Sequence, residues 1–139
     1  MIPAKYAEWK ILFDKIVPLL DEEVIFVGHS LGGIFLAKYL SEESCSKKVK
    51  AVFLVSAPFN TGSEWDRNVD FILPEDMSEL SNQVEDIFLY HSKDDPIVPF
   101  SDCLNYKKAL PRAQVKVFED RQHFNQENFP EILEDIKNL

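Results

Sequence analysis

The stretch that most constrains this chain runs from Val24 to Gly33, where four apolar residues lead into the pattern Gly-x-Ser-x-Gly. A short apolar run that ends at glycine is typical of a buried strand in a parallel sheet, and the apolar residues after Gly33 favour a helix. In that context Ser30 occupies the position of a nucleophile elbow, where Gly28 and Gly32 allow the tight turn. The alternative is a chance occurrence of the pattern in an ordinary turn between a strand and a helix.

Length and composition limit the classes of protein that are compatible with this sequence. The chain has 139 residues, of which 45% are hydrophobic and 28% charged, so we expect a single globular domain over residues 1–139. Its net charge of -9 argues against a nucleic-acid or anionic-membrane partner. Cys45 and Cys103 are too few for a disulfide framework or a metal site, and no signal peptide or membrane-spanning run is present. A cytoplasmic location is therefore expected.

Apolar runs alternate with amphipathic helical patterns along the chain. Strands are predicted over residues 24–27, 51–55, 86–91 and 114–118, and helices over 6–17, 34–40, 102–110 and 127–139. This alternation predicts an α/β fold with a short, mostly parallel sheet of about four strands flanked by helices. The segment 63–82 has two interpretations, a lid on the substrate side or a helix that covers one face of the sheet.

A serine hydroxyl is a poor nucleophile until a base removes its proton, and three histidines are candidates for that base. His29 adjoins Ser30, but consecutive side chains in a tight turn diverge, so we expect it to be a buried support beneath the turn. His91 ends a predicted strand and is expected to hold the following loop. His123 lies after the last strand, at the carboxyl edge of the sheet. We assign the base to His123, the alternative being a surface histidine in a turn.

The base also needs a carboxylate that orients its imidazole. Asp94 and Asp95 both follow the third predicted strand and so lie at the same edge of the sheet. Asp95 is preferred because a Pro-Ile-Val-Pro turn follows it directly, whereas Asp94 can simply be solvated. The resulting order of Ser30, Asp95 and His123 is the α/β-hydrolase order, which differs from the orders of chymotrypsin and subtilisin.

With these residues in place, the chain resembles the α/β-hydrolase superfamily, and within it the small serine hydrolases grouped with the retinoblastoma-binding serine hydrolase. Three stretches carry the resemblance: residues 27–33 (VGHSLGG), 91–99 (HSKDDPIVP) and 123–125 (HFN). The resemblance implies a nucleophile at Ser30, an acid at Asp95 and a base at His123. Gln122 stands where the family usually has glycine.

A second departure from the family concerns the start of the chain. Family members begin with further strands and a His-Gly loop that donates one oxyanion-hole amide, whereas this sequence starts at the helix before the nucleophile strand. The amide of Leu31 is the expected first donor. Amides near Pro3 to Lys5 are a hypothesis for the second donor, because that helix should begin at the catalytic edge.

These features together predict a hydrolase of small carboxylic esters that works through an acyl-enzyme and needs no cofactor or metal. A thioesterase or a small amide hydrolase would use the same residues, and a non-catalytic interaction module on a degenerate hydrolase fold is a different alternative. The expected pocket walls are His29, Leu31, Phe59, Trp65, Ile97 and Phe124.

The strand at 24–27 has the continuous apolar character of an internal strand, yet only one neighbouring strand is encoded after it. Apolar residues also spread around much of the helix that follows the elbow. A monomer would then expose an unpaired edge together with apolar side chains, which soluble proteins normally avoid. We therefore expect a homodimer. The alternative is that the first helix and the segment 63–82 cover this region within one chain.

Overall fold

In the computed structural model, which describes residues 4–60 and 70–139, four parallel strands form one sheet in the order β1-β2-β3-β4. The strands are β1 (Glu23–His29), β2 (Lys48–Val55), β3 (Val84–Ser92) and β4 (Gln114–Phe118). The helices are α1 (Tyr6–Ile16), α2 (Leu31–Glu42), α3 (Ser78–Gln83), α4 (Phe100–Ala109) and α5 (Pro130–Lys137), and the 3₁₀ turn η1 (Val17–Leu19) follows α1. The α/β fold predicted from the sequence is confirmed, and the sheet is entirely parallel within these residues.

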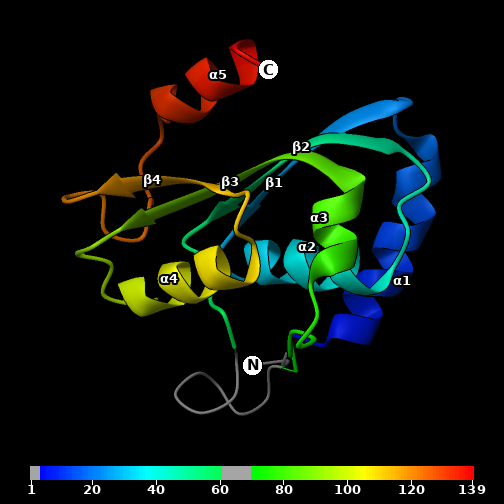
Figure 1. Ribbon diagram of the computed structural model, residues 1–139, viewed down its shortest axis with the longest axis horizontal. Helices are drawn as coiled ribbons and strands as arrows, with labels where there is room; N and C mark the ends of the chain where they lie inside the picture. Colours follow the sequence, from blue (N-terminus) through cyan, green and yellow to red (C-terminus); the bar gives the residue numbers. More distant parts are fainter. Residues whose placement is uncertain (1–3, 61–69) are drawn as a thin grey trace.

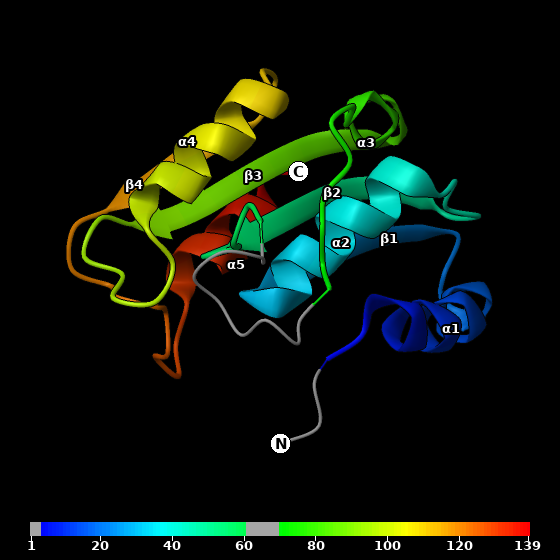
Figure 2. The same cartoon turned by 90° about the horizontal axis from the view of Figure 1, so that it is seen from below.

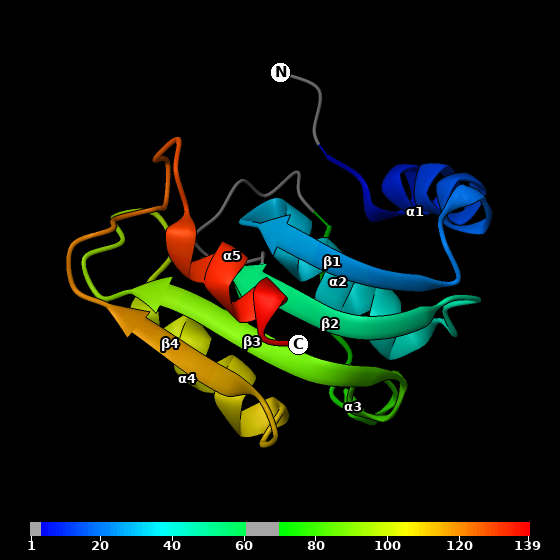
Figure 3. The same cartoon turned by 90° about the horizontal axis from the view of Figure 1, so that it is seen from above.

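The helices cover the two faces of the sheet unequally. Helices α2, α3 and α4 lie on one face, and α5 lies on the opposite face (Figure 1). Helix α1 lies beside the outer edge of β1, as the views from below and above both show (Figures 2 and 3). Because all strands are parallel, the loops that follow β1, β2 and β3 reach the same edge of the sheet.

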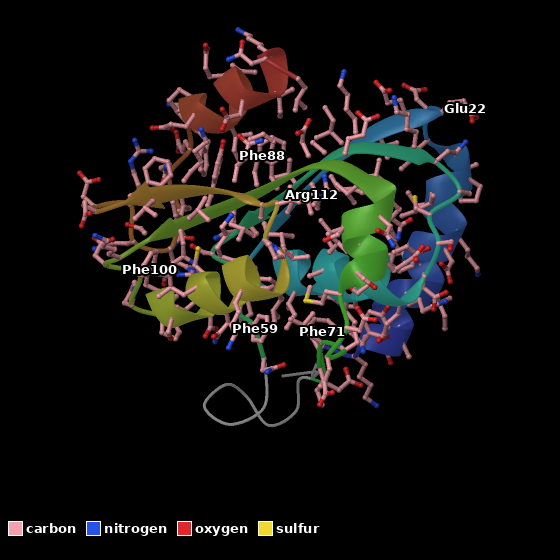
Figure 4. The ribbon with its side chains drawn as sticks, viewed as in Figure 1. Glu22, Phe59, Phe71, Phe88, Phe100 and Arg112 are labelled. Carbon is pink, nitrogen blue, oxygen red and sulfur yellow. The ribbon has the colours of Figure 1, made fainter. Side chains whose placement is uncertain are left out.

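Two apolar clusters hold these layers together. The larger cluster lies between the sheet and α2, where Ile34, Leu40 and Leu54 are almost fully buried. Helix α1 joins this cluster through aromatic contacts, such as that of Phe13 with Phe35 at 5.2 Å between ring centroids. The smaller cluster lies under α5 and contains Phe53, Phe88, Tyr90 and Phe124. Figure 4 shows Phe88 on the α5 side of the sheet and Phe71 on the other side, below α2.

The described part of the segment 63–82 belongs to the core. Phe71 and Leu80 are fully buried, and α3 begins at Ser78 and packs against α2. Of the two interpretations, residues 70–82 therefore support the structural one, and residues 63–69 lie outside the described part of the chain. No helix in the described ranges has the length and apolar character needed to cross a bilayer.

Candidate active site

Ser30 is the residue between β1 and α2, and its backbone has the strained geometry of an elbow. Its φ is 55° and its ψ is -118°, values that non-glycine residues rarely adopt. The Ser30 amide donates to the carbonyl of Val55 at 2.9 Å, and its own carbonyl accepts from the amide of Gly33 at 2.9 Å. These bonds fix Ser30 at the carboxyl end of β1 and the amino end of α2, where the helix dipole favours negative charge.

Close packing around the elbow explains two of its glycines, although not the pair expected from the pattern. A Cβ added at Gly28 would lie 2.5 Å from the carbonyl oxygen of Gly32, and a Cβ at Gly33 would lie 2.6 Å from the Cβ of Ala57. A Cβ at Gly32 would meet no atom within 4 Å. The tight turn therefore does not need glycine at Gly32 for reasons of space, and the second position where close packing requires glycine is Gly33.

The side chains of His123 and Asp95 are paired. The Nδ1 of His123 lies 2.9 Å from Asp95 Oδ2, and the Asp95 side chain is fully buried. An ionised carboxylate only accepts hydrogen bonds, so Nδ1 carries a proton, and in the neutral ring Nε2 is then the nitrogen that can accept one. The residue that the sequence selected as the base is thus held in the tautomer that a base requires.

Asp95 is kept ionised by its surroundings. Burial of the carboxylate raises its pKa, but hydrogen bonds from His123 and from backbone amides lower it more, so the pKa of Asp95 is below its ordinary value of 3.8. The amides are those of Ile97 and Val98, which donate to Asp95 Oδ1 at 2.8 and 2.9 Å. The turn after Asp95 therefore supplies hydrogen bonds as well as rigidity.

His91 has the supporting role that its position predicted. It is 1% exposed, and its Nε2 donates to the carbonyl of Val98 at 2.9 Å. The same nitrogen lies 3.8 Å from Asp95 Oδ2. His91 therefore holds the loop that presents Asp95.

The buried position expected for His29 is wrong. His29 ends an edge strand, so its ring is exposed, and it lies 4.7 Å from the ring of His123 between centroids. Its Nε2 lies 2.6 Å from the backbone oxygen of His123 and, facing a carbonyl, is the donor of this bond. His29, the residue before Ser30, is thus bonded to the loop that carries His123.

The other expected pocket residues are spread over several environments. Phe124 is 6% exposed and stacks on Phe129 at 5.1 Å, so it is a core residue of the α5 side and not an open wall. Phe59 is half-buried against Tyr106, and Ile97 is 49% exposed. Trp65 lies outside the described residues. Leu31 begins α2, so its amide is among those without a partner inside the helix.

A groove of about 380 Å³ opens beside the elbow, between α1 and the free edge of β1. Its walls include Gly28, His29 and Gly32 of the elbow region and Trp9 and Leu12 of α1. A larger groove of about 690 Å³ lies between β4 and α5, and its lining includes none of the candidate catalytic residues. Of these two grooves, the one beside the elbow adjoins the candidate site.

Strained backbone is concentrated at this edge of the sheet. Among the described residues, four that are not glycine have positive φ: Ser30 at 55°, Ser56 at 46°, Gln122 at 50° and Phe124 at 55°. Ser30 and Ser56 follow the carboxyl ends of β1 and β2, and the other two flank His123. Such strain gathers where function requires a fixed geometry. Nothing in the sequence pattern singled out Ser56, whereas Gln122 was marked by standing where the family has glycine.

Comparison with known proteins identifies the family of this chain. A family model described as alpha/beta hydrolase fold matches residues 16–87, which is more than half of the chain. The chain belongs to the alpha/beta hydrolase family. This result confirms the resemblance that the motifs around Ser30, Asp95 and His123 indicated.

The relatives of this alpha/beta hydrolase include characterised and solved proteins. Serine hydrolase RBBP9 of Rattus norvegicus is 30% identical over 121 residues, which are 86% of this chain and 62% of that protein. This chain therefore spans less than two thirds of that curated relative. The ydeN gene product of B. subtilis has a similar structure, with a TM-score of 0.86 and 19% identity over 98% of this chain and 75% of its own.

A carboxylesterase structure from Nitrososphaera gargenis is also similar, with a TM-score of 0.71 and 13% identity over 99% of this chain and 73% of its own. At such low identities the two structural likenesses establish the fold alone. That fold is the α/β arrangement of sheet and helices described above.

Proposed function

We propose that this alpha/beta hydrolase cleaves carboxylic esters, with Ser30 as nucleophile, His123 as base and Asp95 as the acid that orients the base. The observation that carries this proposal is the hydrogen bond of 2.9 Å between His123 Nδ1 and Asp95 Oδ2. It orients the imidazole and assigns the proton of the neutral ring to Nδ1, at the same edge of the sheet as the strained Ser30. The words serine hydrolase and carboxylesterase in the relatives' names agree with this class.

The reaction has two half-reactions. His123 Nε2 takes the proton of the Ser30 hydroxyl as Oγ attacks the ester carbonyl, and the tetrahedral intermediate then expels the alcohol, which receives that proton. A water molecule next attacks the acyl-serine ester, giving its proton to His123, and the carboxylic acid leaves as Oγ is protonated again. Asp95 stays ionised throughout and stabilises the imidazolium, as its lowered pKa allows.

The negative charge that develops on the carbonyl oxygen needs hydrogen-bond donors. The amide of Leu31 in the first turn of α2 is the proposed first donor. Amides near Pro3 to Lys5 remain a hypothesis for the second donor, since Pro3 lies outside the described residues. The amide of the following residue, Tyr6, donates to Asp70 Oδ1 at 2.7 Å and is therefore occupied.

The experiment that tests this function is hydrolysis of a short-chain aryl ester by purified protein. Replacing Ser30 by alanine should lower kcat by about a thousandfold or more, because no other group can form the acyl-enzyme. Ser46→Ala is the matched control, since Ser46 is exposed in the loop before β2, and it should leave the rate unchanged.

Three results would count against the proposal, each against a different part of it. Equal rates for the wild-type protein and Ser30→Ala would eliminate Ser30 as the nucleophile. The absence of turnover with aryl esters, thioesters and amides alike would favour the non-catalytic interaction module instead. Turnover of a thioester or an amide without turnover of esters would retain the proposed roles of the three residues and would replace esters as the substrate class.

A further inference from the structure

The loop that carries His123 is held in an unusual conformation. The residues on either side of His123 both have left-handed backbones, with φ of 50° at Gln122 and 55° at Phe124. Residues other than glycine, asparagine and aspartate seldom adopt this conformation, and it persists where surrounding contacts fix it. The contacts that fix the loop therefore decide where the imidazole of His123 lies.

On the amino side of His123, those contacts converge on one carboxylate oxygen. Oδ1 of Asp94 accepts the amide hydrogen of Gln122 at 2.8 Å and the hydroxyl hydrogen of Ser92 at 2.5 Å. The Ser92 oxygen in turn accepts the amide hydrogen of Arg121 at 3.0 Å. Two consecutive amides before His123 are thus bound, one directly by Asp94 and one through Ser92.

The end of β3 and the turn after it, which supply these acceptors, are themselves held by hydrogen bonds. Ser92 is fully buried at the end of β3, where it is in register with Phe118 of β4. The Lys93 amide donates to the Phe118 carbonyl at 2.8 Å, and the Asp95 amide donates to the Ser92 carbonyl at 3.2 Å. Asp94 therefore projects from an anchored turn.

We propose that Asp94 is a positioning residue for the candidate triad, an inference that rests on the proposed esterase function. The two adjacent aspartates have separate tasks: Asp95 binds the imidazole of His123, and Asp94 binds the backbone that precedes it. Asp94 contacts the amide of Gln122 and not the ring of His123, so it acts through the loop. Its carboxylate is required as a hydrogen-bond acceptor and not as a charge.

The alternative expected from the sequence is that Asp94, which is exposed, is only a solvated surface acid. Substitutions separate these possibilities. Asp94→Asn retains an oxygen at Oδ1 that can accept both hydrogen bonds, whereas Asp94→Ala removes the acceptor. Asp120→Ala is the matched control, because Asp120 is a carboxylate in the same loop whose side chain is 90% exposed and lies 3.8 Å from Arg121 Nε.

The experiment combines ester kinetics with amide hydrogen exchange measured by NMR on uniformly labelled protein. Asp94→Ala should lower kcat by about tenfold or more with KM within about twofold of the wild type, because a displaced base slows chemistry without weakening binding. The Gln122 amide should exchange about tenfold faster in this variant, since its hydrogen bond is lost. Asp94→Asn should stay within about threefold of the wild type in both kcat and the exchange rate of the Gln122 amide. Asp120→Ala should match the wild type in both.

Several outcomes would overturn the proposal. Wild-type kcat and wild-type exchange at Gln122 in Asp94→Ala would show that the carboxylate is only solvated. An equal loss of kcat in Asp94→Asn and Asp94→Ala would show that charge, and not the acceptor, matters. If Asp94→Ala does not fold, Ser92→Ala tests the same hydrogen-bond network. An unchanged exchange rate of the Arg121 amide in Ser92→Ala would contradict the proposed network.

Failure of the proposed function would look different. A wild-type protein without esterase activity, in which the Gln122 amide is nevertheless protected and loses that protection in Asp94→Ala, would refute the function and retain the anchoring of the loop.

Discussion

The Nε2 of His29 lies 2.6 Å from the backbone oxygen of His123, which joins the elbow to the loop of the candidate base. This contact spans residues 94 positions apart in the sequence. It connects the residue next to Ser30 directly to the residue whose imidazole is proposed to activate Ser30. His29 therefore has a definite structural task, although it is not a candidate base.

Removing this bond should slow the reaction. His29→Ala is expected to lower kcat about fivefold, the value of one ordinary hydrogen bond, while His29→Gln, which can still donate from an amide group, should recover part of the loss. Ester hydrolysis at saturating substrate measures both variants. An unchanged kcat in His29→Ala would show that the loop is held without this contact.

The elbow gives a stability prediction with an internal control. Gly28→Ala would place its Cβ 2.5 Å from a backbone oxygen, so the elbow must shift, and we expect a loss of about 1 to 3 kcal/mol together with most activity. Gly32→Ala meets open space and adds a better helix former near the start of α2, so stability should hold or rise by up to about 1 kcal/mol. Chemical denaturation of both variants measures the difference, and equal losses would contradict the packing argument.

The main elements of the fold could be predicted from the sequence because their signals are local. The apolar runs ending at Val27 and at Val55 identify strands through their own composition. Asp95 and His123 could be placed together because the loops after parallel strands meet at one edge of the sheet. These inferences need only the order of elements along the chain.

The remaining details depend on distant contacts and could not be predicted in this way. Gly33 is constrained by Ala57, which comes from the loop after β2, so the elbow pattern alone points to the wrong glycine. Phe124 has a left-handed backbone, and its ring packs into the core under α5. The roles of His29 and Asp94 likewise follow from a loop that is far from each of them in sequence.

The lowered pKa of Asp95 has a consequence for stability against pH. The folded protein holds this carboxylate ionised below its ordinary pKa of 3.8, so the unfolded chain binds the proton first. Stability from Asp95 is therefore fully present above about pH 4 and is lost as pH falls further, through the lower pKa of the folded state. We expect the difference in unfolding free energy between wild type and Asp95→Asn to narrow over that range. A difference that is constant from pH 5 to pH 2.5 would contradict the assignment.

The homodimer remains a prediction, and the structure indicates where to test it. Within the described residues β1 is an edge strand, and its Val27 is 50% exposed. Val27 shares a groove with Leu12 and Ile16 of α1, which are 60% and 41% exposed. We expect a mass near twice 16.1 kDa by light scattering at micromolar concentration. Val27→Lys should shift the protein to the monomer, because a lysine on an edge strand opposes pairing with a second strand.

Val117→Lys is the control for this test, since Val117 is similarly exposed at 44% on the other edge strand, β4. It should leave the mass unchanged. A wild-type protein that runs as a single species of 16.1 kDa would rule out the dimer.

The central claim is that the pair of His123 and Asp95 activates Ser30, and covalent labelling with a fluorophosphonate probe tests it most directly. The probe should add one phosphonyl group per chain, at Ser30 by peptide mass mapping. Labelling should be absent in Ser30→Ala and at least about a hundredfold slower in His123→Ala, because an unactivated serine hydroxyl reacts poorly. A wild-type protein that takes up no probe, or a His123→Ala variant that labels as fast as the wild type, would contradict the claim.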